Sequence, residues 1–329
     1  MTTAAVVGCG DVSIVHLEAI DKLASSRLVA VCDTDRDTAA AAAERYQVPA
    51  FSDHRQLLAT LRPDVVHIST PHHQHAEVAI DCLEAGVNVL LEKPVAHTIA
   101  EAERVLAAAA RHPDVKIAVC FQNRYNAAVR AARSLIDSGD LGVVLGGSAT
   151  VLWHRPPAYY AKRPWRGQRA LSGGGVLINQ AIHTLDLLQW LLGDVTSVAG
   201  QVGTNELGGH VDVEDTAQLV LHHGDIRRSV FFATTANVTD SVVTLEIVAE
   251  RAVLQMRGDL TVSWADGRVE TVSERTASTG GRSYWGVSHE LLIGDFHSSL
   301  GRPGPFWIDP AEGIKTLRIL DELYRANQR

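Results

Sequence analysis

The chain has 329 residues, 46% hydrophobic and 21% charged, which is ordinary for a globular protein of about two domains. Its 38 acidic and 30 basic side chains give a net charge of −8, which argues against a nucleic-acid or anionic-membrane surface. No apolar run approaches the ~18 residues of a membrane span, and no signal peptide is expected before the first strand. The cysteines form no C-x-x-C pair, which predicts reduced, buried thiols in a cytoplasmic protein; they are Cys9, Cys32, Cys82 and Cys120.

A short apolar strand at residues 4–7 is followed at once by a glycine turn and a predicted helix at 12–23. This order of elements is the setting of a dinucleotide-binding fingerprint. Gly8 permits the tight turn, and Gly10 lets the backbone approach a pyrophosphate at the helix N-terminus. Ser13 stands in the place of the third glycine and is still small enough for close packing of helix on strand.

The next apolar strand, 28–32, ends in Asp33, which lies 23 residues after the second glycine of the turn. An acidic residue near this distance binds the ribose 2′-hydroxyl and repels a 2′-phosphate, so we expect NAD rather than NADP. Arg36 keeps NADP as the less favoured alternative, because its guanidinium could bind that phosphate. The other possible role of Asp33 is a helix N-cap, which Thr34 or Asp35 could fill instead.

Strands and helices continue to alternate through the first third of the chain. Six strands with intervening helices predict an α/β, doubly wound parallel sheet, so we assign residues 1–122 to a Rossmann domain that binds NAD(P). The further strands are expected at 49–51, 64–69, 87–91 and 116–120, and the further helices at 37–46, 53–61, 75–85 and 98–111.

A polar loop, Thr70-Pro71-His72-His73-Gln74-His75, follows the strand at 64–69. Three histidines in four positions suggest a metal site. Adjacent residues face apart, however, and no nearby Asp, Glu or Cys completes a ligand set. We therefore predict no metal, and expect the loop to cover the nicotinamide half of the cofactor.

The continuous apolar run at 87–91 is typical of a strand that is buried on both faces of a parallel sheet. It is followed by Glu92, Lys93 and Pro94. Ligands in open α/β sheets bind beyond the carboxyl ends of such strands, and a proline restricts the backbone of the residue before it. Lys93 is therefore expected at the site, the alternative being a surface salt bridge before a turn.

Four motifs occur in this order along the chain: Gly8-x-Gly10, Thr70-Pro71 with His75, Glu92-Lys93-Pro94, and Asn123-Arg124. Together they resemble the Gfo/Idh/MocA oxidoreductase family. That family pairs a Rossmann domain with an open-sheet substrate domain and moves hydride between nicotinamide and a sugar, cyclitol or related alcohol. The resemblance implies that Lys93 lies beside the substrate hydroxyl and the nicotinamide ribose.

The second half begins with a helix at 127–138 and a strand at 143–152. The segment 153–169 is too polar and proline-rich for a core element, so we expect a loop that covers the substrate cleft, the alternative being an exposed connector. The side chains available to line that cleft are Tyr159, Tyr160, Lys162, Trp165 and Arg166.

The stretch Ser172-Gly173-Gly174-Gly175 precedes a predicted helix at 176–192. A glycine-rich start lets the helix backbone approach a ligand closely. Asn179 and His183 are four residues apart and so share one face of this helix, with Asp186 three residues further on.

Oxidising an alcohol requires a base that takes the hydroxyl proton. His183 titrates in the right range, and a desolvated Lys93 can do the same work. The resembled family often carries an aspartate at the position where this chain has Asn179. An asparagine cannot act as a base. Lys93 and His183 are thus the expected acid–base pair, with the division of labour between them open.

Alternating apolar runs in the remaining chain indicate a large open, mostly antiparallel sheet in an α+β domain at 123–329. One face can pack against the helix at 176–192. The other would be a wide exposed apolar face, so we expect a homodimer or homotetramer through this sheet. The runs lie at 195–202, 213–222, 226–235, 241–249, 251–256, 259–264 and 268–273.

Helices near 286–300 and 310–327 close the chain, and the last could return to the Rossmann domain. Asp212, Glu214 and Asp215 are carboxylates that could meet a cationic amino sugar or simply be solvated turn residues.

We expect an NAD-dependent oxidoreductase that acts on a secondary hydroxyl or ketone of a small molecule, with no nucleic-acid or membrane partner. The substrate would be a sugar, a cyclitol or an amino sugar, aminoglycosides and nucleotide-linked sugars included. Arg36 keeps open an NADPH-dependent ketoreductase of deoxysugar assembly, and Asn179 keeps open a cofactor-binding regulator without turnover.

These expectations assign residues to three roles. The catalytic residues are Lys93 and His183. The substrate contacts are Lys93, Arg124, Tyr160, Arg166, Asn179 and His183. The cofactor contacts are Gly8, Gly10, Asp11, Val12, Asp33, Thr70, Pro71, His72, His75, Glu92, Lys93, Asn123, Trp165 and Arg166.

Overall fold

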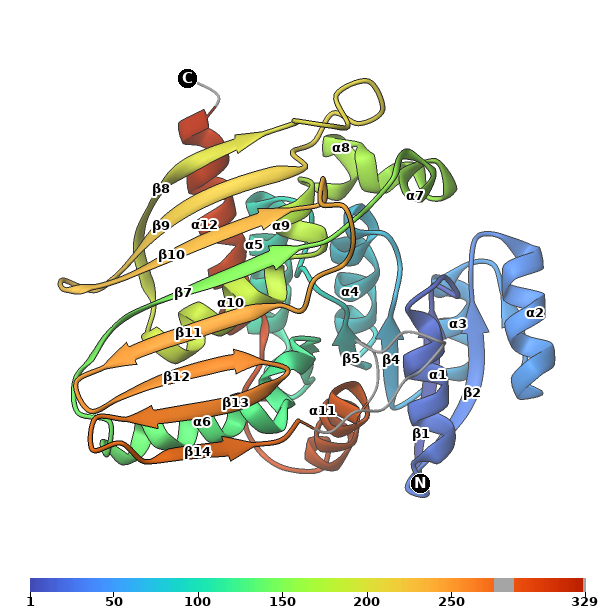
Figure 1. Ribbon diagram of the computed structural model, residues 1–329. Helices are drawn as coiled ribbons and strands as arrows, with labels where there is room; N and C mark the ends of the chain where they lie inside the picture. The colour runs from blue at the N-terminus through green and yellow to red at the C-terminus, as the bar shows by residue number, and fades with distance from the viewer. Residues whose placement is uncertain (275–286, 328–329) are drawn as a thin grey trace. The chain divides into compact units, whose positions relative to one another are not determined.

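The computed structural model describes residues 1–274 and 287–327 (Figure 1). The described residues form two compact units. The first consists of residues 1–122 and 287–314, and the second of residues 123–274 and 315–327. The segment 287–314 therefore belongs with the first unit, although it follows the second in the chain.

The first unit is built on a parallel sheet of six strands in the order β3-β2-β1-β4-β5-β6. This is the doubly wound arrangement that the alternating pattern predicted. Its central strands are fully buried because they carry apolar residues on both faces. The strands are β1 (Thr2–Val7), β2 (Ser26–Cys32), β3 (Ala50–Phe51), β4 (Val65–Ile68), β5 (Asn88–Leu91) and β6 (Ile117–Val119).

Helices pack on this sheet in two groups. Helix α1 packs against α11, whereas α4 packs against both α3 and α5. The helices are α1 (Ser13–Lys22), α2 (Arg36–Tyr46), α3 (His54–Leu61), α4 (His75–Glu84), α5 (Ile99–Arg111) and α11 (Val287–Ser299), with a 3-10 turn η1 (His72–Gln74).

The second unit is built on an eight-stranded sheet in the order β14-β13-β12-β11-β7-β10-β9-β8. All neighbours are antiparallel except β7 and β10, which are parallel. The sheet is thus the open, mostly antiparallel one that was expected. Its strands are β7 (Val144–Leu152), β8 (Val195–Gly203), β9 (Thr216–His223), β10 (Arg227–Thr234), β11 (Thr244–Ala249), β12 (Ala252–Arg257), β13 (Asp259–Trp264) and β14 (Val269–Val272).

Helices cover one face of this sheet, behind the strands as Figure 1 is drawn. The last helix, α12, begins in the first unit and continues into the second at Lys315. The helical elements are η2 (Gln122–Tyr125), α6 (Ala127–Ser138), α7 (Pro157–Lys162), η3 (Pro164–Gly167), α8 (Arg169–Ser172), α9 (Val176–Asn179), α10 (Ile182–Leu192) and α12 (Pro310–Asn327).

Two expected elements differ from the structure. The segment 153–169 is not a loop, because α7 and η3 occupy most of it. Pro157 and Pro164 each stand in the first turn of one of these helices, where a proline's fixed φ favours the helix and its missing N–H costs nothing. The proline content that suggested a loop therefore marks two helix starts.

The expected helix at 176–192 is interrupted between α9 and α10. The backbone N–H groups of Gln180 and Ala181 both point to the carbonyl of Val176, at 3.1 and 2.9 Å. This adds one residue to the turn, a π-type bulge of the kind that often accompanies functional sites. Asn179 and His183 consequently do not share the face of one regular helix.

The other face of the large sheet carries apolar side chains that are exposed in a single copy of the chain. Outward-pointing residues alternate along β9 and β10 with buried ones, as a period of two requires. The exposed apolar side chains of the central strands are Leu145, Val220, Val230 and Phe232.

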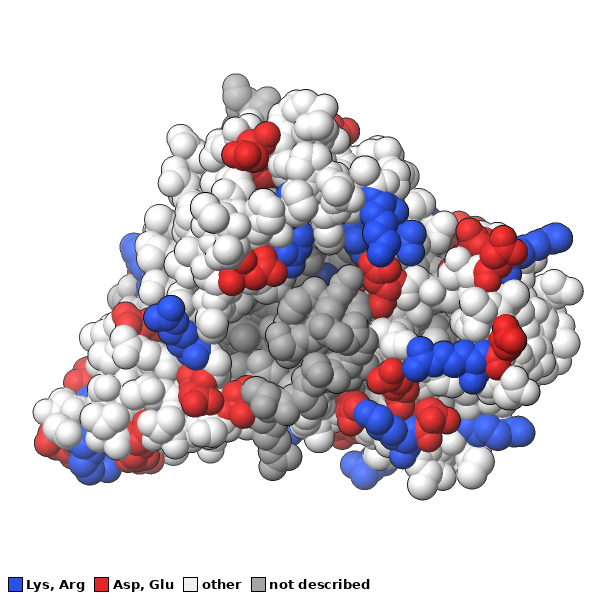
Figure 2. Space-filling model, turned by 45° about the vertical axis from the view of Figure 1, so that its right-hand side comes forward, with Lys and Arg blue, Asp and Glu red and all other residues white. Residues whose placement is uncertain are grey.

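Basic and acidic side chains of the described residues lie interspersed on the face drawn in Figure 2. Among the described helices, none combines the length and the apolar character that a membrane crossing needs.

Candidate active site

The glycine turn after β1 approaches the end of β4 closely. Gly8 has a φ of +90°, and a Cβ there would lie 2.6 to 2.7 Å from backbone atoms of Ser69 and Thr70. Gly8 is thus required both by its backbone conformation and by its neighbours. A Cβ on Gly10 would meet nothing within 4 Å, so the surface above Gly10 is open.

Asp33 is turned back toward this glycine turn. Its Oδ2 accepts the backbone N–H of Cys9 at 2.8 Å, and its Oδ1 accepts the backbone N–H of Asp35 at 2.9 Å. The N-cap of α2 is Asp35, whose side chain accepts the N–H of Thr38. Asp33 is therefore not the cap, and it stands half-buried beside the glycine turn, as a ribose-binding carboxylate would.

The loop after β4 presents two hydroxyl groups toward the same edge of the sheet. The Oγ of Ser69 and the Oγ1 of Thr70 are buried and have no hydrogen-bond partner in the described part of the chain. Buried polar atoms are normally bonded. Two hydroxyl groups beside the glycine turn are thus unbonded, and the surface above Gly10 is open.

His75 joins this loop to the one after β5. Its Nδ1 lies 2.7 Å from the carbonyl oxygen of Pro94, and its Nε2 lies 2.9 Å from that of Thr70. The side chain is fully buried, and burial lowers its pKa although both carbonyl contacts act to raise it. A neutral ring has one N–H and donates to one of the two carbonyl oxygens at a time. His75 was expected to contact the cofactor; the structure places both ring nitrogens on backbone carbonyls, where the residue fixes the two loops.

Glu92 and Lys93 follow β5 at the carboxyl edge of the sheet. The carboxylate of Glu92 is buried and bonded to His16 at 3.0 Å, whereas Lys93 is half-exposed. The Lys93–Pro94 peptide is cis. Because β5 pairs with β4, and β4 with β1, Lys93, Thr70 and Gly8 all follow adjacent strands and emerge at one edge of the first unit.

In the second unit, Arg124 and Asp186 form a buried ion pair. The guanidinium donates to both carboxylate oxygens, from Nε at 2.8 Å and from Nη2 at 2.6 Å. Both side chains are about 1% exposed, and the guanidinium also lies over the ring of Trp190. Arg124 was expected to contact substrate; its burial instead gives it the structural role of joining η2 to α10.

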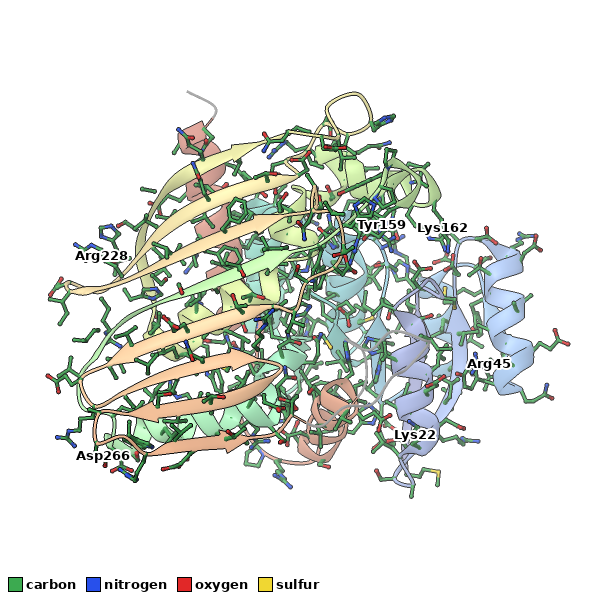
Figure 3. The ribbon with its side chains drawn as sticks, viewed as in Figure 1. Lys22, Arg45, Tyr159, Lys162, Arg228 and Asp266 are labelled. Carbon is green, nitrogen blue, oxygen red and sulfur yellow. The ribbon has the colours of Figure 1, made fainter. Side chains whose placement is uncertain are left out.

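The aromatic residues of α7 divide between the core and the surface. Tyr160 is buried, with its hydroxyl 3.5 Å from Thr235, and burial raises the pKa of that hydroxyl to about 12. Tyr159 is partly exposed and Lys162 of the same helix is exposed; Figure 3 labels both at α7. The ring of Tyr159 lies under the guanidinium of Arg166 at 4.6 Å. Of the residues expected to contact substrate here, Arg166 is therefore accessible and Tyr160 is not.

Asn179 and His183 flank the bulge between α9 and α10, and both are partly exposed. Asn179 donates a long hydrogen bond of 3.4 Å to the carbonyl of Gly174. Gln180, inside the bulge, is buried and donates to the hydroxyl of Tyr159 at 3.2 Å. The bulge thus links the start of α10 to α7.

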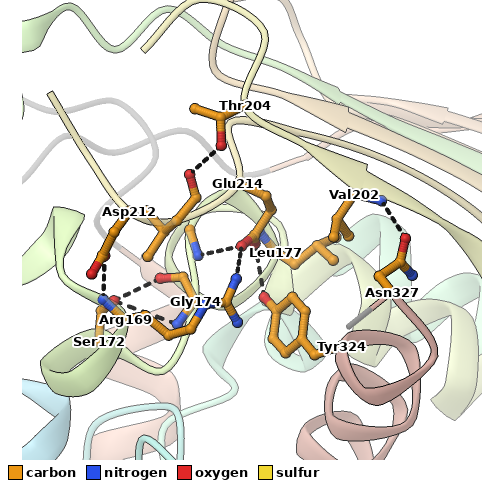
Figure 4. Close-up of polar contacts among 12 residues, drawn as sticks. Arg169, Ser172, Gly174, Leu177, Val202, Thr204, Asp212, Glu214, Tyr324 and Asn327 are labelled. Carbon is orange, nitrogen blue, oxygen red and sulfur yellow. Dashed lines mark hydrogen bonds and ion pairs between the residues drawn. The ribbon is translucent and has the colours of Figure 1, made fainter. Parts of the chain in front are cut away.

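The glycine run before α9 packs against the protein itself. A Cβ on Gly175 would lie 1.8 Å from the carbonyl oxygen of Glu214, and one on Gly174 would lie 2.2 Å from the hydroxyl of Tyr324. The carboxylate of Glu214 accepts the N–H groups of Gly175 and Leu177 and the hydroxyl of Tyr324 (Figure 4). The interpretation of these glycines as room for a ligand is therefore wrong.

The neighbouring carboxylates are not available to a substrate either. Glu214 and Asp215 are both buried, and Asp215 accepts the N–H groups of Asn205, Glu206 and Leu207. Spacing in the sequence could not reveal the contacts of Glu214, since its partners come from distant segments.

Two family models cover most of the chain. Residues 2–121 match the model described as an oxidoreductase family with an NAD-binding Rossmann fold, and residues 129–255 match the Gfo/Idh/MocA C-terminal domain. The chain belongs to the Gfo/Idh/MocA oxidoreductase family. It is thus a family member in both halves, as its four motifs suggested.

Relatives of known activity are sugar and cyclitol dehydrogenases. Levoglucosan dehydrogenase of Pseudarthrobacter phenanthrenivorans is 28% identical, over 89% of this chain and 85% of that protein. Inositol 2-dehydrogenase 2 of Saccharopolyspora erythraea is 31% identical, over 66% of this chain and 61% of that protein. Among solved structures, the WlbA dehydrogenase of Bordetella pertussis, in complex with NADH and UDP-GlcNAcA, is 27% identical with a TM-score of 0.84, over 99% of this chain and 96% of that one.

Proposed function

We propose that this protein is an NAD-dependent dehydrogenase that oxidises a secondary hydroxyl of a sugar, cyclitol or nucleotide-linked sugar, or reduces the corresponding ketone. The observation that carries the proposal is the edge of the first unit where Gly8, Thr70 and Lys93 follow the adjacent strands β1, β4 and β5. Ligands of doubly wound sheets bind at this edge, and here the edge carries a potential proton acceptor. The two family matches and the activities of the relatives support the same chemistry.

We propose that the cofactor lies along the glycine turn. Gly10 leaves room for the pyrophosphate, Asp33 accepts the ribose hydroxyls, and the hydroxyls of Ser69 and Thr70 supply further hydrogen bonds. Asp33 still has acceptor capacity, because each of its oxygens accepts only one hydrogen bond from the backbone. When bound, NAD supplies the acceptor for the hydride that leaves the substrate carbon.

Lys93 is the residue that we assign to the substrate hydroxyl. An amine in a partly desolvated position can take the hydroxyl proton as the hydride departs, and can return it in the reverse direction. His183 of the second unit is the alternative acid–base group. Asn179 and Arg166 are the proposed polar contacts to substrate in that unit, whereas Arg124 and Tyr160 act through packing.

The second candidate function is an NADPH-dependent ketoreductase, because Arg36 is exposed three residues after Asp33. The carboxylate of Asp33 opposes it, since a 2′-phosphate would lie against a negative charge.

The test is a tryptophan energy-transfer titration with NADH and NADPH, followed by a screen for NADH formation. The screen contains levoglucosan, myo-inositol, D-glucosides, D-apiose and UDP-linked sugars with NAD⁺. Tight NADH binding with turnover of one of these classes is expected. Binding of NADPH at least tenfold tighter than NADH would favour the ketoreductase, and binding of neither cofactor would refute both.

We also propose a homodimer or homotetramer that covers the exposed apolar side chains of β7, β9 and β10, because such a face is costly to leave in water. Light scattering of wild type and of Val230→Glu tests this proposal. We propose a reducing, cytoplasmic compartment, because the four cysteines are free thiols. Burial raises the pKa of Cys9 and of Cys32 to about 12, which makes these two thiols unreactive.

A further inference from the structure

The interior of the first unit contains a continuous chain of hydrogen-bonded side chains that the proposed function does not use. Glu92 Oε1 lies 3.0 Å from His16 Nε2, and His16 Nδ1 lies 3.0 Å from His67 Nδ1. His67 Nε2 lies 2.8 Å from His297 Nε2, and His297 Nδ1 lies 2.7 Å from the Ser26 hydroxyl. Every ring nitrogen of the three histidines is therefore in the chain.

This chain runs from one edge of the sheet to the other. Glu92 follows β5 at the carboxyl edge, where Lys93 stands, and Ser26 begins β2 at the amino edge. Between them, His67 lies in β4, His16 in α1 and His297 in α11. Five segments of the chain thus contribute to one continuous path.

The path is buried along its whole length, and its centre is slightly less exposed than its ends. His16 and His67 are 0% exposed, whereas Glu92 is 5%, His297 is 6% and Ser26 is 8% exposed. Burial lowers the pKa of His67 well below its usual range and that of His297 to about 4, so both rings are neutral. A structural core would more simply use apolar side chains in such a place, because each buried imidazole needs two partners.

With Glu92 ionised and all three rings neutral, one arrangement of protons satisfies the chain. Burial raises the pKa of Glu92, but the hydrogen bond from His16 and the nearby histidines and Lys93 outweigh it and bring the pKa below its usual range. A carboxylate accepts, so His16 carries its proton on Nε2, and its Nδ1 must accept from His67. His67 then carries its proton on Nδ1, and His297 carries its own on Nε2 and accepts the Ser26 hydroxyl on Nδ1.

The second oxygen of Glu92 is also bonded, since it accepts the backbone N–H of Lys93 at 3.3 Å. His16, Glu92 and Cys120 lie close enough to hold a metal ion. Burial and the neighbouring Glu92 raise the pKa of the Cys120 thiol well above its usual range, so without a metal ion the sulfur keeps its proton. We therefore assign hydrogen-bonding protons, and no metal ion, to the polar atoms of His16, Glu92 and Cys120.

We propose that Glu92, His16, His67, His297 and Ser26 form a proton relay between Lys93 and solvent at the amino edge of the sheet. This inference rests on the proposed dehydrogenase function. In ketone reduction a proton enters at Ser26, each histidine passes its own proton to the next acceptor and exchanges its tautomer, and one proton arrives on Glu92. Lys93 passes one of its own ammonium protons to the substrate oxygen and takes the replacement from Glu92, and the three imidazole rings rotate back to their starting tautomers before the next turnover. Alcohol oxidation runs the same transfers in reverse, so one proton leaves for each hydride transferred.

The tautomers test the relay without any turnover. The full chain is labelled with ¹⁵N-histidine, and the three rings are assigned with His16→Gln, His67→Gln and His297→Gln variants. The expected spectrum shows His67 protonated on Nδ1 and both His16 and His297 protonated on Nε2 at pH 7. An imidazolium at any of the three positions, or a proton on Nε2 of His67, would overturn the assignment. So would a stoichiometric metal ion in the purified protein that is lost in His16→Gln.

Turnover then tests the use of the relay. His67→Gln retains a side chain that can form hydrogen bonds but cannot exchange tautomers, so a merely structural role would survive it. We expect kcat to fall at least tenfold, with KM and NADH affinity within about twofold of wild type, and a reduced solvent isotope effect. The matched control is His54→Gln, which changes a histidine of the same unit that pairs with Asp81 outside the relay.

The outcomes separate the two proposals. If His67→Gln and His297→Gln both keep the wild-type kcat and solvent isotope effect, the relay is refuted and the dehydrogenase stands. If the wild-type protein oxidises none of the alcohols in the screen, the dehydrogenase proposal fails, and with it the role of the chain in turnover. His297→Gln serves in place of His67→Gln if the latter does not fold.

Discussion

Asp33 accepts the backbone N–H of Cys9 at 2.8 Å, which ties the end of β2 to the glycine turn after β1. Replacing Asp33 with alanine removes this tie and the acceptor that we assign to the ribose. We expect NADH affinity to fall about tenfold or more, ~1.4 kcal/mol, and NADPH affinity to fall less. The energy-transfer titration measures both. Asp35→Ala is the control, because it removes only the N-cap of α2; equal losses in the two variants would contradict the assignment.

Gly10 and Gly8 give a second prediction, because they differ in the space around them. Gly10→Ala adds a methyl group where nothing lies within 4 Å, so the free protein should unfold at the same urea concentration as wild type. NADH should nevertheless bind at least tenfold more weakly, since the methyl occupies the proposed pyrophosphate position. Gly8→Ala should instead be unstable, because its Cβ would clash with the backbone after β4. Unchanged NADH affinity in Gly10→Ala would place the cofactor elsewhere.

Lys93→Met tests the proton transfer. Methionine keeps much of the length of the side chain without an amine, so NADH binding should be unchanged. Turnover should fall by a factor of hundreds or more, on the scale of about 10² to 10⁴ typical of acid–base catalysis. Stopped-flow or steady-state NADH formation measures it. Turnover within a few-fold of wild type would remove Lys93 from the mechanism and leave His183 as the acid–base group.

The buried ion pair of Arg124 and Asp186 predicts that removing one partner alone strongly lowers the free energy of unfolding. Arg124→Ala leaves the carboxylate of Asp186 buried without its partner, which costs roughly 3–5 kcal/mol. Urea unfolding monitored by circular dichroism measures this loss. Arg104→Ala, which breaks an exposed pair with Glu101, is the control and should change the free energy of unfolding by less than about 1 kcal/mol. A small effect of Arg124→Ala would mean that water reaches Asp186.

The buried histidines make stability depend on pH. Burial holds the pKa of His289 and of His297 at about 4, against 6.5 for an unperturbed histidine. Between these values the unfolded chain binds protons that the folded chain does not, so stability must fall as the pH is lowered from about 6.5 to about 4. Each histidine contributes up to about 3 kcal/mol to this loss. Urea midpoints measured across that window check it, and His289→Gln should flatten the dependence.

Three features were predictable from the sequence: the strand, glycine turn and helix at the N-terminus, the alternation of six strands with helices in a doubly wound sheet, and the positions of the sheet strands in the second unit. These features rest on local periodicity and on short motifs, which depend on residues close together in the chain. The placement of Asp33 beside the glycine turn and of Lys93 after β5 follows from the same rules, because strand ends meet at one edge of a parallel sheet.

Only the tertiary structure decided the rest. The bulge between Asn179 and His183, the glycines that pack against Glu214 and Tyr324, and the burial of Arg124 depend on partners brought in from elsewhere in the chain. The path from Ser26 to Glu92 is the clearest case. Its residues lie on α1, β2, β4, α11 and the end of β5, and no spacing in the sequence signals that three distant histidines share their protons.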